Sequence, residues 1–194
     1  MIKFQTFSSK IRSAWSEIPK PILKFALKGL IIFIIWQIIY TNFLKPNRIL
    51  DKPITFLIGN STILLLQKTY STDTFYIREI KYFNADIEFF ESSKAVIYKN
   101  NFKLIGIGDS CNGLEMYILY IAFIFIFPSR LKNKINYILF GIPIIIFSNI
   151  IRCYGLCIVQ LYSPHFFVYA HHYIFKIITY FVVFFLWIKF AKTT

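Results

Sequence analysis

The sequence has few acidic residues, few cysteines and few histidines, and the pattern of the cysteines and histidines argues against particular classes of protein. Its 194 residues include 9 Asp and Glu against 22 Lys and Arg, with only 3 Cys and 3 His. No two cysteines form a Cys-x-x-Cys pair, which argues against a disulfide framework and against a thiol oxidoreductase. The His-Glu-x-x-His pattern of zinc peptidases is also missing, so we expect no metal and no cofactor.

Apolar residues are abundant instead. Hydrophobic residues make up 57% of the chain and aromatic residues 20%, and several apolar runs reach about 20 residues, the length that crosses a bilayer. We therefore expect a polytopic α-helical membrane protein surrounded by the lipid bilayer. The formal net charge of +13 comes from cations beside the apolar runs, which favours a role in membrane topology and in contacts with anionic lipid over nucleic-acid binding.

The apolar runs predict one membrane domain, residues 1–194, with about four transmembrane helices. Short loops rich in Lys and Arg stay in the cytoplasm, and such a loop follows the second run. This rule places both termini in the cytoplasm, and we expect the protein to reside in the plasma (inner) membrane. We expect a basic cytoplasmic tail at 1–21, spans at 22–44, 113–128, 135–161 and 171–190, and an extracytoplasmic segment at 45–112.

The extracytoplasmic segment has its own expected structure. The apolar stretch from Ile54 to Gln67 is short for a span and predicts a helix, interfacial by preference, with a re-entrant helix or one packed against the bundle as alternatives. The β-rich stretches 95–98 and 102–105 flank Asn100-Asn101, a pair that tolerates positive φ, and so predict a β-hairpin. Residues 75–83 are a candidate for an additional strand. The second arm of the hairpin leads directly into a polar stretch, which the small sheet would hold in place.

This polar stretch, residues 108–115, contains a thiol at Cys111 among small and polar residues. The predicted topology brings Arg152, His171 and His172 to the same membrane face as Cys111. Polar and ionisable groups at membrane depth are costly and by default mark a functional site. A nucleophilic thiol needs some exposure and a cationic neighbour, and a helix N-terminus beside Arg152 and a histidine would provide both. Cys111 is therefore the candidate nucleophile.

The other two cysteines have a simpler interpretation. Cys153 and Cys157 lie one helical turn apart in an apolar helix, where cysteine is a common packing residue. Cys111 fits that interpretation less well, because Asp109, Ser110 and Asn112 surround it.

The remaining candidates also have structural interpretations. Arg152 is also compatible with a structural ion pair to Glu115, which lies one turn below the thiol. Asn149 shares the helix face of Arg152 and can either orient the guanidinium or a substrate amide, or form a simple interhelical hydrogen bond. His171 and His172 are equally compatible with anchoring at the membrane interface.

Three motifs together resemble those of the exosortase/archaeosortase family, and most closely its short F-type forms. They are Cys111-Asn112-Gly113, Asn149-Ile150-Ile151-Arg152, and a histidine at the head of a later span. The family often has Gly four residues after this histidine, whereas Phe175 and Lys176 occupy the corresponding positions here. We favour His172 as the family histidine and keep His171 beside it.

The resemblance implies an integral membrane cysteine protease or transpeptidase. Such enzymes process exported proteins that end in a recognition motif, a transmembrane helix and a basic cluster, and they cut at the outer face of the membrane. Cys111 would attack the peptide bond, Arg152 would stabilise the oxyanion, and His172 or His171 would transfer protons. Asn149, Asn112 and Glu115 are supporting candidates, although Glu115 has no family role. The alternative is a non-catalytic scaffold or accessory subunit of envelope assembly.

Overall fold

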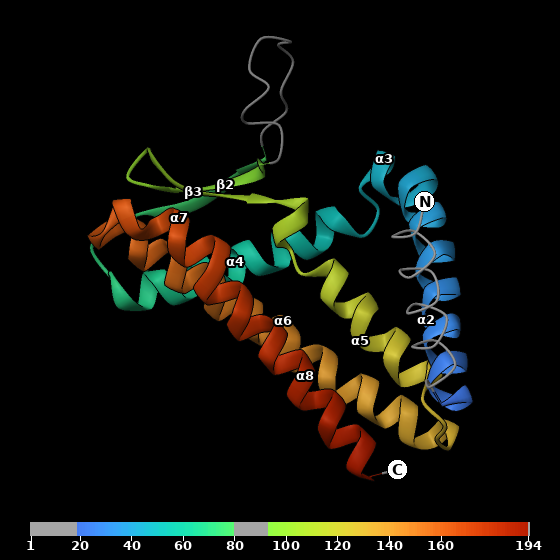
Figure 1. The fold of residues 1–194 in the computed structure, drawn as a ribbon. Helices are drawn as coiled ribbons and strands as arrows, with labels where there is room; N and C mark the ends of the chain where they lie inside the picture. Colours follow the sequence, from blue (N-terminus) through green and yellow to red (C-terminus); the bar gives the residue numbers. More distant parts are fainter. Residues whose placement is uncertain (1–18, 80–92, 194) are drawn as a thin grey trace, which may run out of the picture.

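The computed structural model describes residues 19–79 and 93–193. The fold consists of a bundle of long apolar helices that carries a small β-sheet at one end (Figure 1). Most of the predicted basic tail and the end of the candidate strand at 80–83 lie outside the described residues.

Three helical segments are long and apolar enough to cross a membrane. The first comprises α2 (Lys20–Ile39), a π-helical turn (Tyr40–Leu44) and α3 (Lys45–Asn47). The second is α6 (Leu131–Tyr162). The third starts at Pro164–Phe166 and continues through α7 (Phe167–Tyr169), a π-helical turn (Ala170–Ile174) and α8 (Phe175–Thr193). These segments contain the predicted spans 22–44, 135–161 and 171–190.

The remaining predicted span, 113–128, corresponds to α5 (Leu114–Ile126), which is shorter than a membrane-crossing helix. Its 13 residues extend about 20 Å at the usual helical rise, against a hydrocarbon thickness of about 30 Å. Gly113, with φ of 84°, delays the start of the helix, and Phe127 leaves it before Pro128. The described chain therefore has three candidate spans of full length, and the expected count of four is not confirmed.

The sheet confirms the predicted hairpin. Strands β2 (Ser93–Lys99) and β3 (Phe102–Gly108) pair antiparallel, and β1 (Phe75–Glu79) pairs with β2 on its other side. Asn100 and Asn101 have φ values of 46° and 72°, the left-handed conformation that a tight hairpin turn requires.

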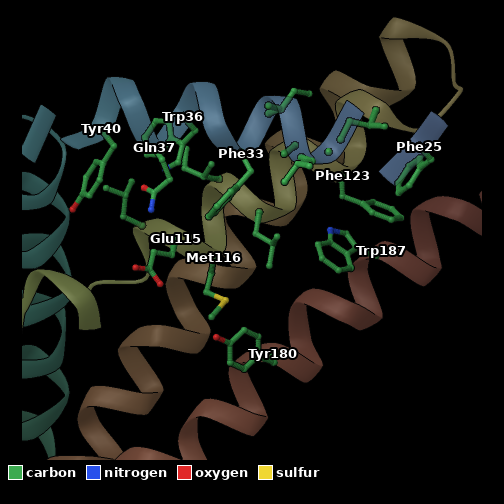
Figure 2. A pocket seen from close by; sticks show the side chains of 18 of the residues that line it. Phe25, Phe33, Trp36, Gln37, Tyr40, Glu115, Met116, Phe123, Tyr180 and Trp187 are labelled. Atoms are coloured by element: carbon green, nitrogen blue, oxygen red, sulfur yellow. The ribbon is translucent and has the colours of Figure 1, made fainter. Parts of the chain in front are cut away.

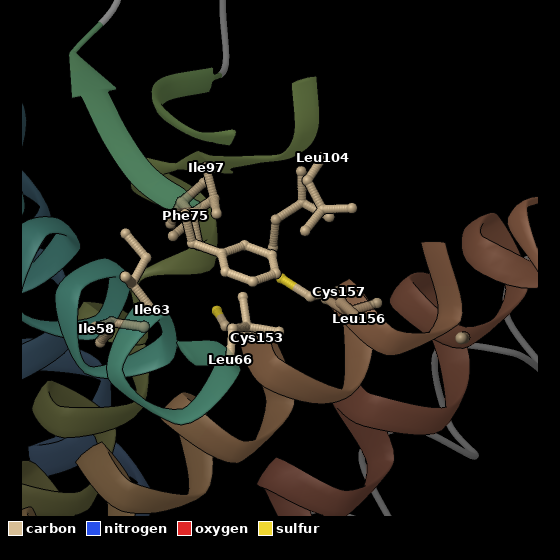
Figure 3. Packing of buried hydrophobic residues seen from close by; sticks show 12 residues of the cluster. Ile58, Ile63, Leu66, Phe75, Ile97, Leu104, Cys153, Leu156 and Cys157 are labelled. Atoms are coloured by element: carbon tan, nitrogen blue, oxygen red, sulfur yellow. The ribbon is translucent and has the colours of Figure 1, made fainter. Parts of the chain in front are cut away.

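Helix α4 (Asp51–Thr69) lies between the sheet and α6, and it contains the predicted helix at 54–67. The inner face of the sheet, including Ile97, packs on Ile58 of α4 and on Cys153 and Cys157 of α6 (Figure 3). Both cysteines are buried in this apolar cluster, in agreement with their interpretation as packing residues. The cluster attaches the sheet, and with it the end of β3, firmly to the bundle.

Candidate functional site

A short irregular connection after β3 carries Cys111. A 3₁₀ turn covers Asp109–Cys111, and Gly113 then turns the chain into α5. Two observations disfavour any side chain at position 113. The φ of Gly113 is 84°, which other residues rarely adopt, and a Cβ there would lie 2.8 Å from Asn149 Nδ2. The glycine that follows the Cys-Asn pair is therefore required by the backbone path of the Cys111 turn.

Arg48 fixes the start of this turn. Its guanidinium donates two hydrogen bonds to Asp109, at 2.9 and 2.7 Å, and one to Glu79 of β1, at 3.0 Å. The hydrogen bonds to Asp109 raise the pKa of Arg48 above its usual value, so the guanidinium stays charged. Bidentate arginine–carboxylate pairs of this kind combine strength with a defined geometry.

Asn112 fixes the other side of the turn. Its Nδ2 donates to Asp51 Oδ1 at 2.9 Å, and its Oδ1 accepts from the backbone N–H of Leu114 at 2.9 Å. Asp51 also accepts a hydrogen bond from the Tyr40 hydroxyl at 3.1 Å. Asp51 and Asn112 are both fully buried, and buried polar networks are rigid when their groups are paired.

Arg48 and Asp51 were not predicted as site residues. The sequence indicates only a polar break between the first apolar run and the next helix, where charged residues are expected in any case. Their role depends on the distance between this break and residues about sixty positions later, which no local pattern encodes.

Three of the predicted site residues meet at one small cavity. Cys111 Sγ lies 3.8 Å from His171 Nε2. Cys111, Arg152 and His171 all line a cavity of about 10 Å³, beside residues 105–107 of β3 and Phe167. A space of this size holds about one water molecule, so a peptide substrate requires the surrounding elements to separate.

His171, and not His172, faces the thiol. The π-helical turn Ala170–Ile174 directs His171 toward Cys111, and the His171 ring stacks on Phe167 with centroids 5.8 Å apart. His172 is exposed and touches the edge of the His171 ring. The geometry therefore differs from our preference for His172 as the family histidine.

Asn149 and Arg152 lie on the face of α6 that is turned toward the Cys111 turn. Both are buried, and Asn149 Nδ2 donates to the Cys111 carbonyl at 3.3 Å. Four buried polar atoms near the cavity have no hydrogen-bond partner within the described chain, namely Asn149 Oδ1, Arg152 Nε, Arg152 Nη2 and His171 Nδ1. Buried polar groups are normally paired, so such a cluster marks a place where a ligand's polar groups can bind.

Glu115 does not join this cluster. No ion pair between Arg152 and Glu115 occurs among the described residues, and Glu115 is exposed on the side of α5 that faces α2. The structural interpretation of Arg152 as the partner of Glu115 is therefore not supported.

The fold and this site define a class of protein, a multi-pass membrane protein with a cysteine, an arginine and a histidine gathered beneath a small sheet. The sequence profile of the transmembrane exosortases (Exosortase_EpsH) matches residues 86–188, just over half of the chain. The chain belongs to this family. Comparisons with curated proteins and with solved structures returned no match.

The matched segment contains Cys111, Arg152 and the candidate histidines His171 and His172, but it excludes Arg48 and Asp51. The match therefore leaves out the two residues, Arg48 and Asp51, that bond to Asp109 and Asn112 and hold the Cys111 turn.

Proposed function

We propose that this protein is a membrane-embedded cysteine peptidase or transpeptidase that removes C-terminal sorting signals from exported proteins. The family implies a transpeptidase-like role, and one observation of this chain supports the chemistry. A thiol and an imidazole lie 3.8 Å apart at a cavity that an arginine also lines. A nucleophile within reach of a base, beside a cation for the developing charge, is the arrangement that covalent catalysis of acyl transfer requires.

The proposed reaction begins with proton transfer from Cys111 Sγ to His171 Nε2. The thiolate attacks the carbonyl carbon of the scissile peptide bond, and the charge that develops on the carbonyl oxygen is stabilised by Arg152. The C–N bond then breaks, and His171 returns the proton to the leaving amine. A thioester between Cys111 and the N-terminal part of the substrate remains, until an acceptor amine or a water molecule attacks it and restores the thiol.

Arg152 suits the oxyanion role because its Nε and Nη2 are buried donors near the thiol with no partner in the described chain, whereas the unpaired Oδ1 of Asn149 is an acceptor. Donors that are fixed before the reaction need no reorganisation when charge develops. The hydrogen bond from Asn149 to the Cys111 carbonyl holds the turn in register with the face of α6 that carries Arg152.

The proposal includes an orientation in the plasma (inner) membrane. The short loop between α5 and α6 ends at Arg130, and the first turn of α6 adds Lys132 and Lys134; short basic connections of this kind remain cytoplasmic. Both termini are then cytoplasmic, and the Cys111 turn and the sheet lie on the extracytoplasmic face. The partners are exported proteins with a C-terminal motif, a transmembrane helix and a basic cluster.

Intact-mass analysis of membrane and envelope proteins tests the proposal. Cells with the wild-type enzyme are compared with cells that carry Cys111→Ala or the control Cys157→Ala, each verified to be present in the membrane. We expect precursors with retained C-terminal segments to accumulate only with Cys111→Ala. Identical masses in all three strains would exclude the enzymatic proposal and favour the scaffold.

A further inference from the structure

A large apolar groove lies on the opposite side of the Cys111 turn from the small cavity. It occupies about 790 Å³ between α2 and α5 and reaches α8 (Figure 2). Its walls are mostly aromatic and aliphatic side chains, including Phe25, Phe33, Trp36, Leu119, Phe123 and Trp187. This volume is typical of a ligand site, and its length follows α5 from Leu114 to Ile126.

One end of the groove is polar and adjoins the Cys111 turn. Asp109 and Leu114, which flank the turn, both line the groove, and so do Glu115 and Tyr40. Asp109 is paired with Arg48. Glu115 has no hydrogen bond or ion pair among the residues that the structure describes, and Figure 2 shows its carboxylate at this end of the groove.

We propose that this groove binds one face of the substrate's transmembrane helix, with the N-terminus of that helix at Glu115. This inference rests on the proposed function, which requires a membrane helix immediately after the scissile bond. That helix must lie beside the enzyme within the bilayer, close to Cys111. The groove is continuous with the Cys111 turn, and a few extended residues of about 3.3 Å each lead from the scissile bond around the turn.

Charge distinguishes this occupant from a phospholipid. The substrate helix begins at the outer membrane face, so its N-terminus, with unpaired N–H groups and a partial positive charge, would meet the Glu115 carboxylate. A phospholipid bound along the same groove would instead place its anionic phosphate beside the Glu115 carboxylate, since the charge of Asp109 is already paired with Arg48. The acidic end therefore favours a helix N-terminus. The apolar walls suit a helix face that presents side chains at i, i+3, i+4 and i+7.

Photocrosslinking tests the location of the substrate. In a Cys111→Ala background, which prevents turnover, p-benzoylphenylalanine replaces either Phe33 in the groove or Phe147 on α6. These side chains are similarly exposed, at 56% and 62%, and α6 contributes no residue to the groove. The probe is an epitope-tagged precursor that accumulates in Cys111→Ala cells. We expect crosslinks from Phe33 to the precursor's transmembrane segment, and at least fivefold fewer from Phe147.

Glu115 variants provide a second readout. Glu115→Gln should raise KM for the precursor about two- to fivefold with kcat unchanged, because it removes one charge from a helix terminus. Glu115→Lys should raise KM about tenfold by reversing that charge. Both variants should lower the unfolding temperature only slightly, because Glu115 makes no ion pair or hydrogen bond in the described chain and stabilises the fold only through its charge in the first turn of α5.

The failures of the two proposals can be told apart. If Cys111→Ala accumulates no precursor, the proposed function is wrong and this inference is wrong with it. If wild type processes the precursor but Phe33 and Phe147 crosslink equally, or Phe33 crosslinks mainly to phospholipid, only the helix-binding groove is excluded. Unchanged KM values for both Glu115 variants would also exclude it.

Discussion

Cys111 Sγ and His171 Nε2 lie 3.8 Å apart, although sixty residues separate them in the chain. The cysteine is held by a 3₁₀ turn at the end of a strand, and the histidine by a π-helical turn ahead of α8. Neither belongs to a regular helix or strand, and π-helical turns occur frequently at functional sites. Their contact depends on the sheet, α6 and the last helix packing together.

The two adjacent histidines should differ sharply in function. His171→Ala should lower the rate of precursor processing about 10²- to 10⁴-fold, the usual contribution of a general base and acid. His172→Ala should leave the rate within about twofold, because His172 is exposed and does not face the thiol. Processing of a purified precursor by each variant in liposomes measures this difference. A larger loss with His172→Ala would contradict the assignment.

Arg152 should be needed for catalysis rather than for folding. Arg152→Gln should reduce kcat about 10²- to 10³-fold, because it removes the charge beside the developing oxyanion. The variant should still insert and should not be less stable, since Arg152 has no ion pair within the described chain and two of its buried nitrogens are unpaired. Single-turnover kinetics and thermal unfolding of the same preparations check both statements. Loss of stability with normal kcat would reassign Arg152 as structural.

Asp51 should control the position of the nucleophile. Asp51→Ala removes the acceptor of the partly buried Tyr40 hydroxyl and leaves the buried Asn112 Nδ2 with only two longer contacts of 3.4 Å, to the backbone carbonyl of residue 51 and to Thr55 Oγ1. Loss of a buried group's best hydrogen bond costs about 1–3 kcal/mol. We expect lower stability and, well below the unfolding temperature, altered alkylation of Cys111 together with slower processing.

The control for Asp51 is Thr62→Ala in the same helix, because the Thr62 hydroxyl bonds only to Ile58 within α4. It should change stability without changing alkylation of Cys111. Identical effects of the two substitutions on Cys111 would show that Asp51 supports the fold alone.

Alanine substitutions at two glycines of the long apolar helices should differ in their effect on stability. A Cβ at Gly141 would overlap the ring of Tyr120, whose hydroxyl donates to the Tyr137 carbonyl. Gly141→Ala should therefore destabilise the protein by about 1–3 kcal/mol through overpacking. Gly29→Ala should be tolerated, because its Cβ would meet only Ile126 at 3.7 Å. Thermal unfolding in the same detergent compares them, and equal melting temperatures would contradict this packing.

The contribution of the turn before β1 to the stability of the fold should depend on pH. Hydrogen bonds from Lys99 and Asn100 lower the pKa of the Asp73 carboxyl below its usual value. A carboxyl with a lowered pKa stabilises the fold above its ordinary pKa near 4, and this contribution is lost as pH falls through the lowered value. Asp73→Asn should therefore reduce the melting temperature at pH 6, and the difference from wild type should shrink toward pH 3. A constant difference across this range would contradict the linkage.

Much of the fold follows from local sequence. The β-hairpin could be predicted because Asn100-Asn101 tolerates the positive φ of its turn, and both residues adopt it. The long spans could be predicted because apolar runs of that length have few other uses. The short length of α5 could not be predicted from its apolar composition alone. Gly113 at its start and Pro128 after its end limit the helix to 13 residues.

The site was predicted only in part. Asn149 and Arg152 stand out as polar residues in an apolar run, and Cys111 stands out as a thiol among small and polar residues; the three converge in the fold. The choice between His171 and His172 depends on a π-helical turn, which rotates the helix by an amount that periodicity does not reveal. Arg48 and Asp51 could not be predicted as site residues, because their partners, Asp109 and Asn112, lie 61 residues further along the chain.

The most direct test of the proposed mechanism is detection of the acyl-enzyme. Purified enzyme in liposomes is mixed with a precursor from Cys111→Ala cells, quenched in acid and analysed by intact mass. We predict an adduct on Cys111 that contains the substrate up to the cut site, is released by hydroxylamine, and is missing in Cys111→Ala, which leaves the precursor uncut. Cleavage of the precursor by Cys111→Ala at the wild-type rate would contradict the mechanism.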